Sequence, residues 1–119
     1  MQFDARALFR TQAERLKKLW ARRLKLGRGS GGRILAPKDK PDGKPLGGRI
    51  PSTITRAEVT TSHSGWRVDV SGLKAVVGFH RGRSGQVARP LIDLPRDELR
   101  RNARELLDEI RRYAKAAKL

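Results

Sequence analysis

The chain has 119 residues, and its 28 Lys and Arg outweigh 12 Asp and Glu, for a formal net charge of +16 at pH 7. This length fits one domain with one modest core, and the absence of Cys excludes disulfides, thiolate metal sites and thiol nucleophiles. The charge exceeds what solubility requires, so we expect an anionic partner, either nucleic acid or an acidic protein surface; a generally basic surface without a dedicated site is the alternative.

An amphipathic helix is expected from Ala5 to Leu26, with Asp4 as its N-cap and Gly27 as its C-terminal stop. Its apolar stripe has helical spacing and consists of Phe9, Leu16, Leu19, Trp20 and Leu24. The other faces are basic: Arg10, Arg15, Lys17, Lys18, Arg22, Arg23 and Lys25. Such a helix suits a membrane surface or a nucleic-acid groove, but its narrow stripe favours packing on its own sheet or on a neighbouring subunit.

Residues 27–48 are dense in Gly, Pro and Lys, which predicts a long loop or arm instead of regular structure. A stretch of this length without helix or strand is usually functional or disordered. Two interpretations stand side by side: an arm that orders against a partner, and a merely mobile loop. A phosphate-binding loop is not expected, because no apolar strand precedes the glycines and no Gly-Lys-Ser/Thr follows them.

From Ile50 to Phe79 the pattern changes to a period of two, which predicts extended chain. Turn signals at Ser64-Gly65 and Ser71-Gly72 divide this region into three runs. We therefore expect a three-stranded antiparallel meander. The side chains expected to face a helix are Trp66, Val68, Val77 and Phe79.

A second long helix is expected after Pro95, with acidic residues in its first turn. Its apolar stripe comprises Leu99, Ala103, Leu106, Ile110, Ala114 and Ala117, thickened by Leu107. The expected fold is α+β in a single domain over residues 1–119. In chain order it has an N-terminal amphipathic helix, the arm at 27–48, the three-stranded meander and a C-terminal helix packed on the sheet.

Residue patterns of catalysis and metal binding are absent from the sequence. The two histidines, His63 and His80, belong to no cluster with metal-ligand spacing. The acidic pairs at 97–98 and 108–109 lie on helix turns among arginines, where acids are usually surface charge. We expect no catalytic residue, metal or cofactor, and no enzyme. No apolar run approaches the roughly 18 residues of a membrane span, so a soluble protein without a membrane partner is expected.

Two classes of function remain: a structural subunit of an assembly, and a nucleic-acid-binding module. The net charge and the run Arg-Gly-Arg-Ser-Gly at 81–85 favour nonspecific phosphate contact. Against a base-stacking platform, the only aromatics beyond the first helix are Trp66, Phe79 and Tyr113, two of which the core needs.

Three motifs, in order over about residues 34–100, resemble the phage virion-morphogenesis family of tail-completion, neck and head–tail joining proteins. The first is Pro41-Asp42-Gly43, and the second runs from Leu46 to Ile54 as Leu-Gly-Gly-Arg-Ile-Pro-Ser-Thr-Ile. The third is Phe79-His80 followed by Ala88-Arg89-Pro90, and it is the most specific of the three. The resemblance implies a virion structural protein, made in the host cytoplasm, that forms a homo-oligomeric ring joining the tail to the head connector.

The partners that this resemblance implies are other copies of the chain, further neck, connector or tail proteins, and DNA in the lumen of the ring. Independently of the family, Pro90 pushes Arg89 toward extended geometry and so projects a guanidinium that can bind a carboxylate or phosphate. An internal salt bridge from Arg89 to an acid such as Asp93 is the alternative.

Two sets of candidate site residues follow. The expected subunit or partner interface comprises Arg89, Pro90, His80, Trp20, Leu24, Ile34 and Leu35. The candidate contacts to DNA or to an acidic surface are Arg28, Arg33, Lys38, Lys40, Lys44, Arg81 and Arg83.

Overall fold

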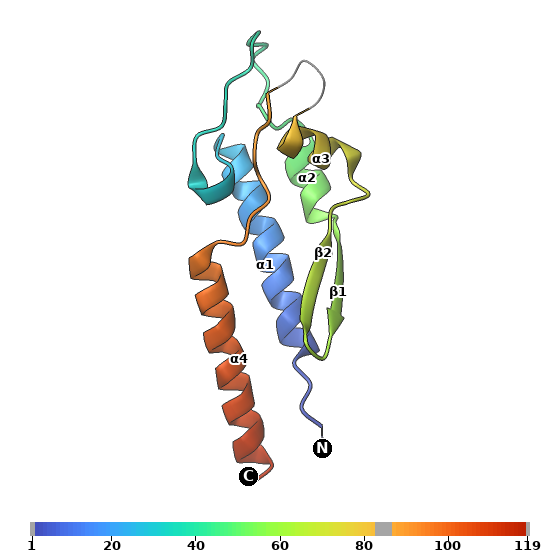
Figure 1. Ribbon diagram of the computed structural model, residues 1–119, viewed down its shortest axis with the longest axis vertical. Helices are drawn as coiled ribbons and strands as arrows, with labels where there is room; N and C mark the ends of the chain where they lie inside the picture. The colour runs from blue at the N-terminus through green and yellow to red at the C-terminus, as the bar shows by residue number, and fades with distance from the viewer. Residues whose placement is uncertain (1, 83–86, 119) are drawn as a thin grey trace.

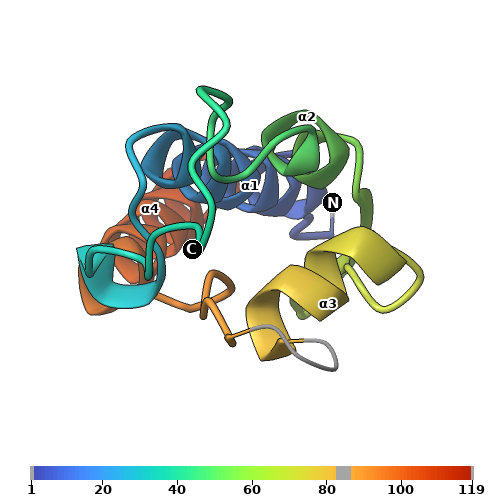
Figure 2. The ribbon, with the colours of Figure 1, turned by 90° about the horizontal axis from the view of Figure 1, so that it is seen from above.

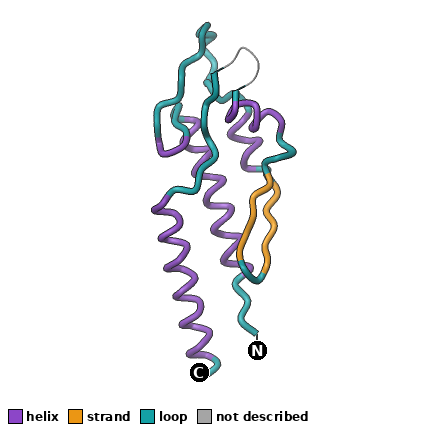
Figure 3. The backbone as a smooth tube through the Cα atoms, viewed as in Figure 1, coloured by secondary structure: helices purple, strands orange, loops and turns teal. Residues whose placement is uncertain are grey.

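The structure is a computed structural model that describes residues 2–82 and 87–118. Its helices and strands are, in chain order, α1 (Arg6–Lys25), the 3₁₀ turn η1 (Ser30–Gly32), α2 (Ile50–Thr55), β1 (Glu58–Ser62), β2 (Gly65–Asp69), α3 (Lys74–Arg81) and α4 (Arg96–Ala116). The molecule is elongated, at 63 × 25 × 20 Å, and both termini lie at the same end (Figure 1). Long loops gather at the opposite end (Figure 3).

Helix α1 is the central helix of the fold, and it confirms the first predicted helix. Its apolar stripe packs into a core with three side chains from later elements that have no exposed surface: Ile54, Val76 and Leu91. The hairpin and α2 contact α1 on one side, and α4 runs along another (Figure 1). Seen from above, α1 and α2 lie side by side and α3 lies across from them (Figure 2). Gly27 ends the helix as predicted, with φ +70°.

The predicted three-stranded meander is wrong. Among the described residues, the sheet consists of β1 and β2 alone, an antiparallel pair with Val59 opposite Val68 and Ser62 opposite Gly65. The third predicted strand, Ala75 to Phe79, belongs to α3, where Val76 is fully buried. A short apolar run fits a buried helix as well as a strand, so its periodicity could not decide between them.

The start of the predicted strand region is also helical. Residues Ile50–Thr55 form α2, which has Pro51 in its first turn, a position that suits proline. The Thr53 hydroxyl donates to the Arg49 carbonyl at 3.0 Å, and the Thr55 hydroxyl donates to the Ser52 carbonyl at 2.8 Å. These bonds satisfy the hydroxyls within the helix, and they let threonines that favour strands occupy it.

The expected packing of the C-terminal helix on the sheet is wrong as well. Helix α4 contacts α1, and no residue of α4 is buried. In place of the predicted meander with a helix packed on it, the described residues form four α-helices, α1 being the central one, and one β-hairpin. The helices contain about half of the residues. In the described part of the chain, every helix is too short or too polar to cross a bilayer.

Lys17 is buried, although the sequence places it among the basic residues of a solvated helix face. Its ammonium donates to the carbonyls of Thr55 at 3.1 Å and Ala57 at 2.7 Å, and it lies 3.1 Å from the Glu14 carboxylate. Thr55 is the last residue of α2, where helix carbonyls lack partners of their own, and Ala57 lies just beyond the end of the helix. Lys17 therefore caps α2 from α1 and joins the two helices.

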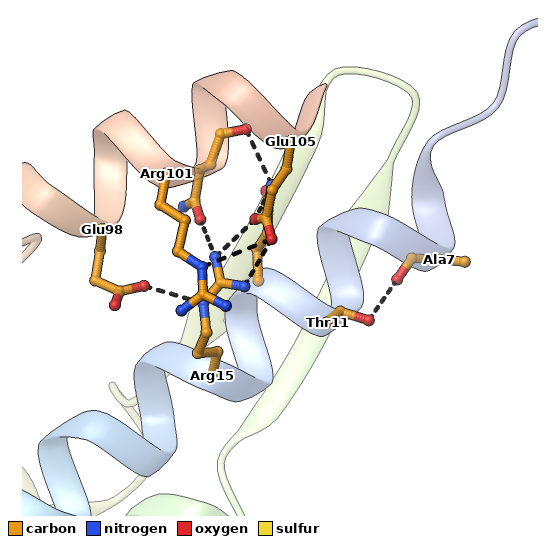
Figure 4. Close-up of polar contacts among 8 residues, drawn as sticks. Ala7, Thr11, Arg15, Glu98, Arg101 and Glu105 are labelled. Carbon is orange, nitrogen blue, oxygen red and sulfur yellow. Dashed lines mark hydrogen bonds and ion pairs between the residues drawn. The ribbon is translucent and has the colours of Figure 1, made fainter. Parts of the chain in front are cut away.

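A polar cluster attaches α4 to α1 (Figure 4). The Arg15 guanidinium donates to Glu105 at 2.7 and 3.0 Å, to Glu98 at 3.1 Å and to the side-chain oxygen of Asn102 at 2.7 Å. The buried Gln12 amide donates to Glu105 at 3.2 Å and to the Asn102 carbonyl at 3.1 Å. A single arginine thus holds three α4 side chains, all on one edge of that helix.

This cluster predicts that α4 loosens in acid. The hydrogen bonds from Arg15 lower the pKa of the Glu105 carboxyl below its ordinary 4.5, and partial burial opposes them. A lowered pKa contributes stability that is present above 4.5 and lost as the pH falls through the folded-state value. We therefore expect the distance between α1 and α4 to become heterogeneous only below the ordinary pKa of Glu105.

Spin labels on Thr11→Cys and Asp108→Cys would measure this distance, because the chain has no other Cys. Glu105→Gln should broaden the distance distribution at neutral pH and abolish its pH dependence. Glu109→Gln, which alters a glutamate paired with Arg112, is the matched control and should behave as the parent does. A sharp, unchanged distance in Glu105→Gln would show that the cluster does not hold α4.

Candidate functional site

The third motif is assembled into one junction at the loop end of the molecule. Phe79 and His80 end α3, and the segment with Ala88, Arg89 and Pro90 runs back past them toward α4. His80 Nδ1 accepts the backbone N–H of Leu91 at 2.8 Å and that of Ile92 at 3.1 Å. Because Nδ1 accepts, the ring proton of a neutral His80 lies on Nε2. His80 thus positions the chain that follows Arg89.

Arg89 binds the arm. Its guanidinium donates to the carbonyls of Ala36 and Pro37, both at 2.9 Å, and it lies 5.9 Å from the centre of the Phe79 ring. Its backbone N–H donates to the Phe79 carbonyl at 3.0 Å. Arginine suits this position because its planar fork reaches two carbonyls while its face covers an aromatic ring. The alternative sequence-based interpretation, a salt bridge from Arg89 to Asp93, is wrong.

Asp93 instead joins α1, the arm and the approach to α4. Its two carboxylate oxygens accept hydrogen bonds from Nη1 of Arg23, at 3.1 and 3.2 Å. They also accept the Trp20 indole N–H at 3.1 Å and the Gly31 backbone N–H at 2.9 Å. The Trp20 N–H also contacts the Asp93 carbonyl, at 3.0 Å. Every oxygen of Asp93 therefore holds a neighbouring segment.

The first part of the arm, residues 27–37, is packed against the body. The Ser30 N–H donates to the Pro90 carbonyl at 2.9 Å, and Leu35 is buried. A Cβ on Gly29 would lie 2.1 Å from that same carbonyl, so only glycine allows so close an approach. Most residues from 38 to 45 are exposed. The arm therefore has a fixed base and an exposed tip.

A groove of about 450 Å³ lies between the base of the arm and the Arg89 segment. Its lining is mostly apolar and backbone: Ser30, Gly31, Arg33, Ile34, Leu35, Ala36, Ala88, Arg89, Pro90 and Asp93. Ile34 in this groove is 78% exposed. Val87, which precedes the Ala88 of the lining, is 57% exposed and lies beside the arm tip, outside the groove. A concave site with an exposed aliphatic side chain and two arginines suits an apolar side chain of a partner.

No family model matches this chain. No curated protein and no solved structure matches it either.

The candidate interface residues separate into two groups. Trp20, Leu24 and Leu35 are buried in the chain's own core, so their side chains are not available to a partner. Ile34 and Pro90 are exposed, whereas His80 and Arg89 are half-buried and engaged at the junction. The surface that a partner can reach here is thus smaller than the predicted set.

The candidate basic contacts lie mainly on the arm. Arg28, Arg33, Lys40 and Lys44 are exposed, as is Arg81 at the end of α3. Lys38 pairs with Asp42 at 2.6 Å, and Arg28 donates to the Gly32 carbonyl at 3.1 Å. Arg83 lies outside the described residues. These cations are spread along the arm and are not gathered at the groove.

Sequence reasoning did not assign a role to Asp93 beyond a partner for Arg89, and it left out Val87. A signal for Asp93 was present, because an acid between Ile92 and Leu94 in an otherwise apolar run needs a buried partner. Among the residues that the structure describes, no three His, Asp or Glu side chains lie together in a way that could hold a metal ion.

Proposed function

We propose that this protein is a structural subunit of a phage head–tail junction, a tail-completion or neck protein that forms a ring around the path of the DNA. The observation that carries the proposal is the meeting of Phe79-His80, Ala88-Arg89-Pro90 and the arm in one junction. Hydrogen bonds join the two parts of the third motif, and Arg89 in that motif also binds the Ala36 and Pro37 carbonyls of the arm. A motif that forms such a junction needs no catalytic role.

The groove supplies the kind of contact that a ring requires. A ring arises when one surface of a subunit binds a different surface of the next and the rotation closes. Ile34 is an aliphatic side chain exposed at this surface, where burial by a neighbour would be favourable. Because Arg89 fixes the base of the arm beforehand, docking a neighbour there costs less ordering entropy.

Ile34→Glu tests this proposal, because it replaces the exposed apolar side chain of the contact by a charged one and leaves the core unchanged. We expect it to reduce the number of assembled particles at least about tenfold, since the apolar burial is lost and a carboxylate is costly to desolvate. Arg89→Ala should also reduce assembly by freeing the arm. Thr60→Glu, at an exposed position on β1, is the control and should assemble normally. Particle counts by electron microscopy give the readout.

Electron microscopy of the native complex should also show several copies around one axis. A native complex with no contact between copies, or full assembly of Ile34→Glu, would overturn the proposal.

Nonspecific nucleic-acid binding is the second candidate, and the exposed cations of the arm favour it. If phosphate contact is the main role, log K for duplex DNA should fall with log salt by about 0.9 per neutralised phosphate, and Arg81→Ala should reduce that slope by about one. If the protein is instead a structural subunit, we expect it to bind duplex DNA only weakly at physiological salt. Ile34→Glu should then change the affinity for DNA by no more than about threefold, through its added charge alone. Tight duplex binding at that salt would favour the second candidate.

A further inference from the structure

We propose that the apolar face of α4 binds an acidic amphipathic helix of a partner protein. This α4 face is formed by Leu99, Ala103, Leu106, Leu107 and Ile110. It lies on the lower half of the molecule in Figure 1, away from the groove at the loop end. The inference therefore does not depend on a role at a head–tail junction.

The side of α4 that attaches to the body is polar, so the attachment does not bury the apolar stripe of the helix. The residues that contact α1 are Glu98, Asn102 and Glu105, through Arg15 and Gln12 (Figure 4). Leu99 and Leu106 each follow one of these glutamates by one residue, which is about 100° around a helix. The apolar stripe is thus turned to the side of the α1 contact: Leu106 is half-buried, whereas Leu99, Leu107 and Ile110 stay exposed.

The exposure of the stripe agrees with this rotation. Leu99 and Leu107 are each 45% exposed and Ile110 is 43% exposed, on a helix with no buried residue. From Leu99 to Ile110 the stripe runs about 17 Å along α4, which is about three turns of helix. A continuous apolar stripe of this length on a highly charged protein indicates an interaction surface.

The charges beside the stripe identify the partner's chemistry. Beyond Leu107, the outer edge of α4 carries Arg100, Arg104 and Arg111. Within the described residues, Arg100 and Arg104 have no carboxylate partner, and Arg111 lies 3.9 Å from Asp108. The glutamates on the opposite edge are already bound by Arg15. The surface of α4 that a partner can contact therefore combines leucine and isoleucine with arginines, two of which have no carboxylate partner within the described residues.

A second copy of this chain does not fit that surface. Two antiparallel α4 helices would place their arginine edges against each other, because equivalent edges face in that arrangement. Two parallel helices would place the arginine edge of one against the edge that α1 covers in the other. Each copy also carries a net charge of +16. A helix with an apolar stripe and a row of Asp or Glu meets both the stripe and the arginines.

A designed 21-residue helical peptide tests the proposal on the full chain. The probe has Leu and Ile along one stripe and Glu on both flanks, and the matched peptide has Lys in place of every Glu. We expect the Glu peptide to bind at least about tenfold more tightly, because two or three exposed ion pairs contribute a few-fold each. The difference should shrink as salt rises from about 0.05 to 0.5 M. Fluorescence anisotropy of labelled peptide measures both.

Two double variants separate the apolar and charged contributions. Leu107→Gln/Ile110→Gln should weaken binding of the Glu peptide by about tenfold or more, whereas Leu26→Gln, at an even more exposed leucine of another segment, should not. Arg100→Glu/Arg104→Glu should reverse the preference toward the Lys peptide. Lys18→Glu/Arg22→Glu, at exposed positions of α1, adds the same charge change and should keep the preference. Circular dichroism confirms that each variant is folded.

Three results would overturn the proposal. Equal binding of the two peptides would mean that the arginines do not select the partner. A dimer of the full chain that Leu107→Gln/Ile110→Gln dissociates would assign the α4 face to a second copy. Binding to vesicles with anionic lipid, lost in the same variant, together with no binding of the Glu peptide, would assign it to a membrane surface.

Discussion

Asp93→Ala is expected to lower the free energy of unfolding by about 2–3 kcal/mol and to release the base of the arm. The substitution leaves the Arg23 guanidinium, the Trp20 side-chain N–H and the Gly31 N–H without their shared acceptor. The Asp93 and Arg23 side chains are each 20% exposed, so water compensates part of the loss, and the value stays below that of a fully buried ion pair.

Chemical denaturation measures the stability change, and brief trypsin digestion at Arg28 and Arg33 measures release of the arm. Asp39→Ala is the matched control, because it removes an exposed carboxylate from the arm tip. We expect the control to change stability by less than about 0.5 kcal/mol and to leave cleavage at Arg28 and Arg33 unchanged. Equal stability of the two variants would show that the Asp93 contacts are not formed in solution.

Lys17→Met is expected to lower the free energy of unfolding by about 2–3 kcal/mol, although it replaces a charge by an apolar side chain of similar length. The Thr55 and Ala57 carbonyls would lose their shared donor in a site where the lysine side chain is 4% exposed. An unsatisfied buried carbonyl costs about 1–3 kcal/mol, and removing the desolvated ammonium offsets part of that cost.

Lys18→Met is the control, because Lys18 is the exposed neighbour of Lys17 on α1. It should change stability by no more than about 0.5 kcal/mol. Hydrogen exchange adds a local readout, since amides of α2 should lose protection in Lys17→Met before those of α1 do. A Lys17→Met protein as stable as the parent would mean that water replaces the ammonium at these carbonyls.

The two proposed surfaces occupy opposite ends of the molecule. The groove at the loop end, between the arm and the Arg89 segment, is proposed to contact other copies of the chain. The α4 face is proposed to contact an acidic helix of another protein. Because α1 connects the two ends as one continuous helix, a subunit can engage both at once. The Ile34→Glu and Leu107→Gln/Ile110→Gln variants separate these contacts experimentally.

Local sequence was enough to predict the two long helices. In α1 and α4 the apolar spacing repeats over 20 and 21 residues, which only a helix satisfies. The turn between β1 and β2 was likewise visible in the signal at Ser64-Gly65. The sequence singled out His80 and Arg89 as residues of a subunit or partner interface, and it did not reveal that Arg89 binds arm carbonyls of its own chain.

Tertiary structure alone decided the rest, for two physical reasons. Segments of six to eight residues, such as Ile50–Thr55 and Lys74–Arg81, fit helix or strand equally well, and packing against α1 and each other selects the helix. The environment of a charged side chain depends on residues far away in the chain. Lys17 is buried by carbonyls about 40 positions later, and Arg15 turns the polar edge of α4 inward and leaves its leucines exposed.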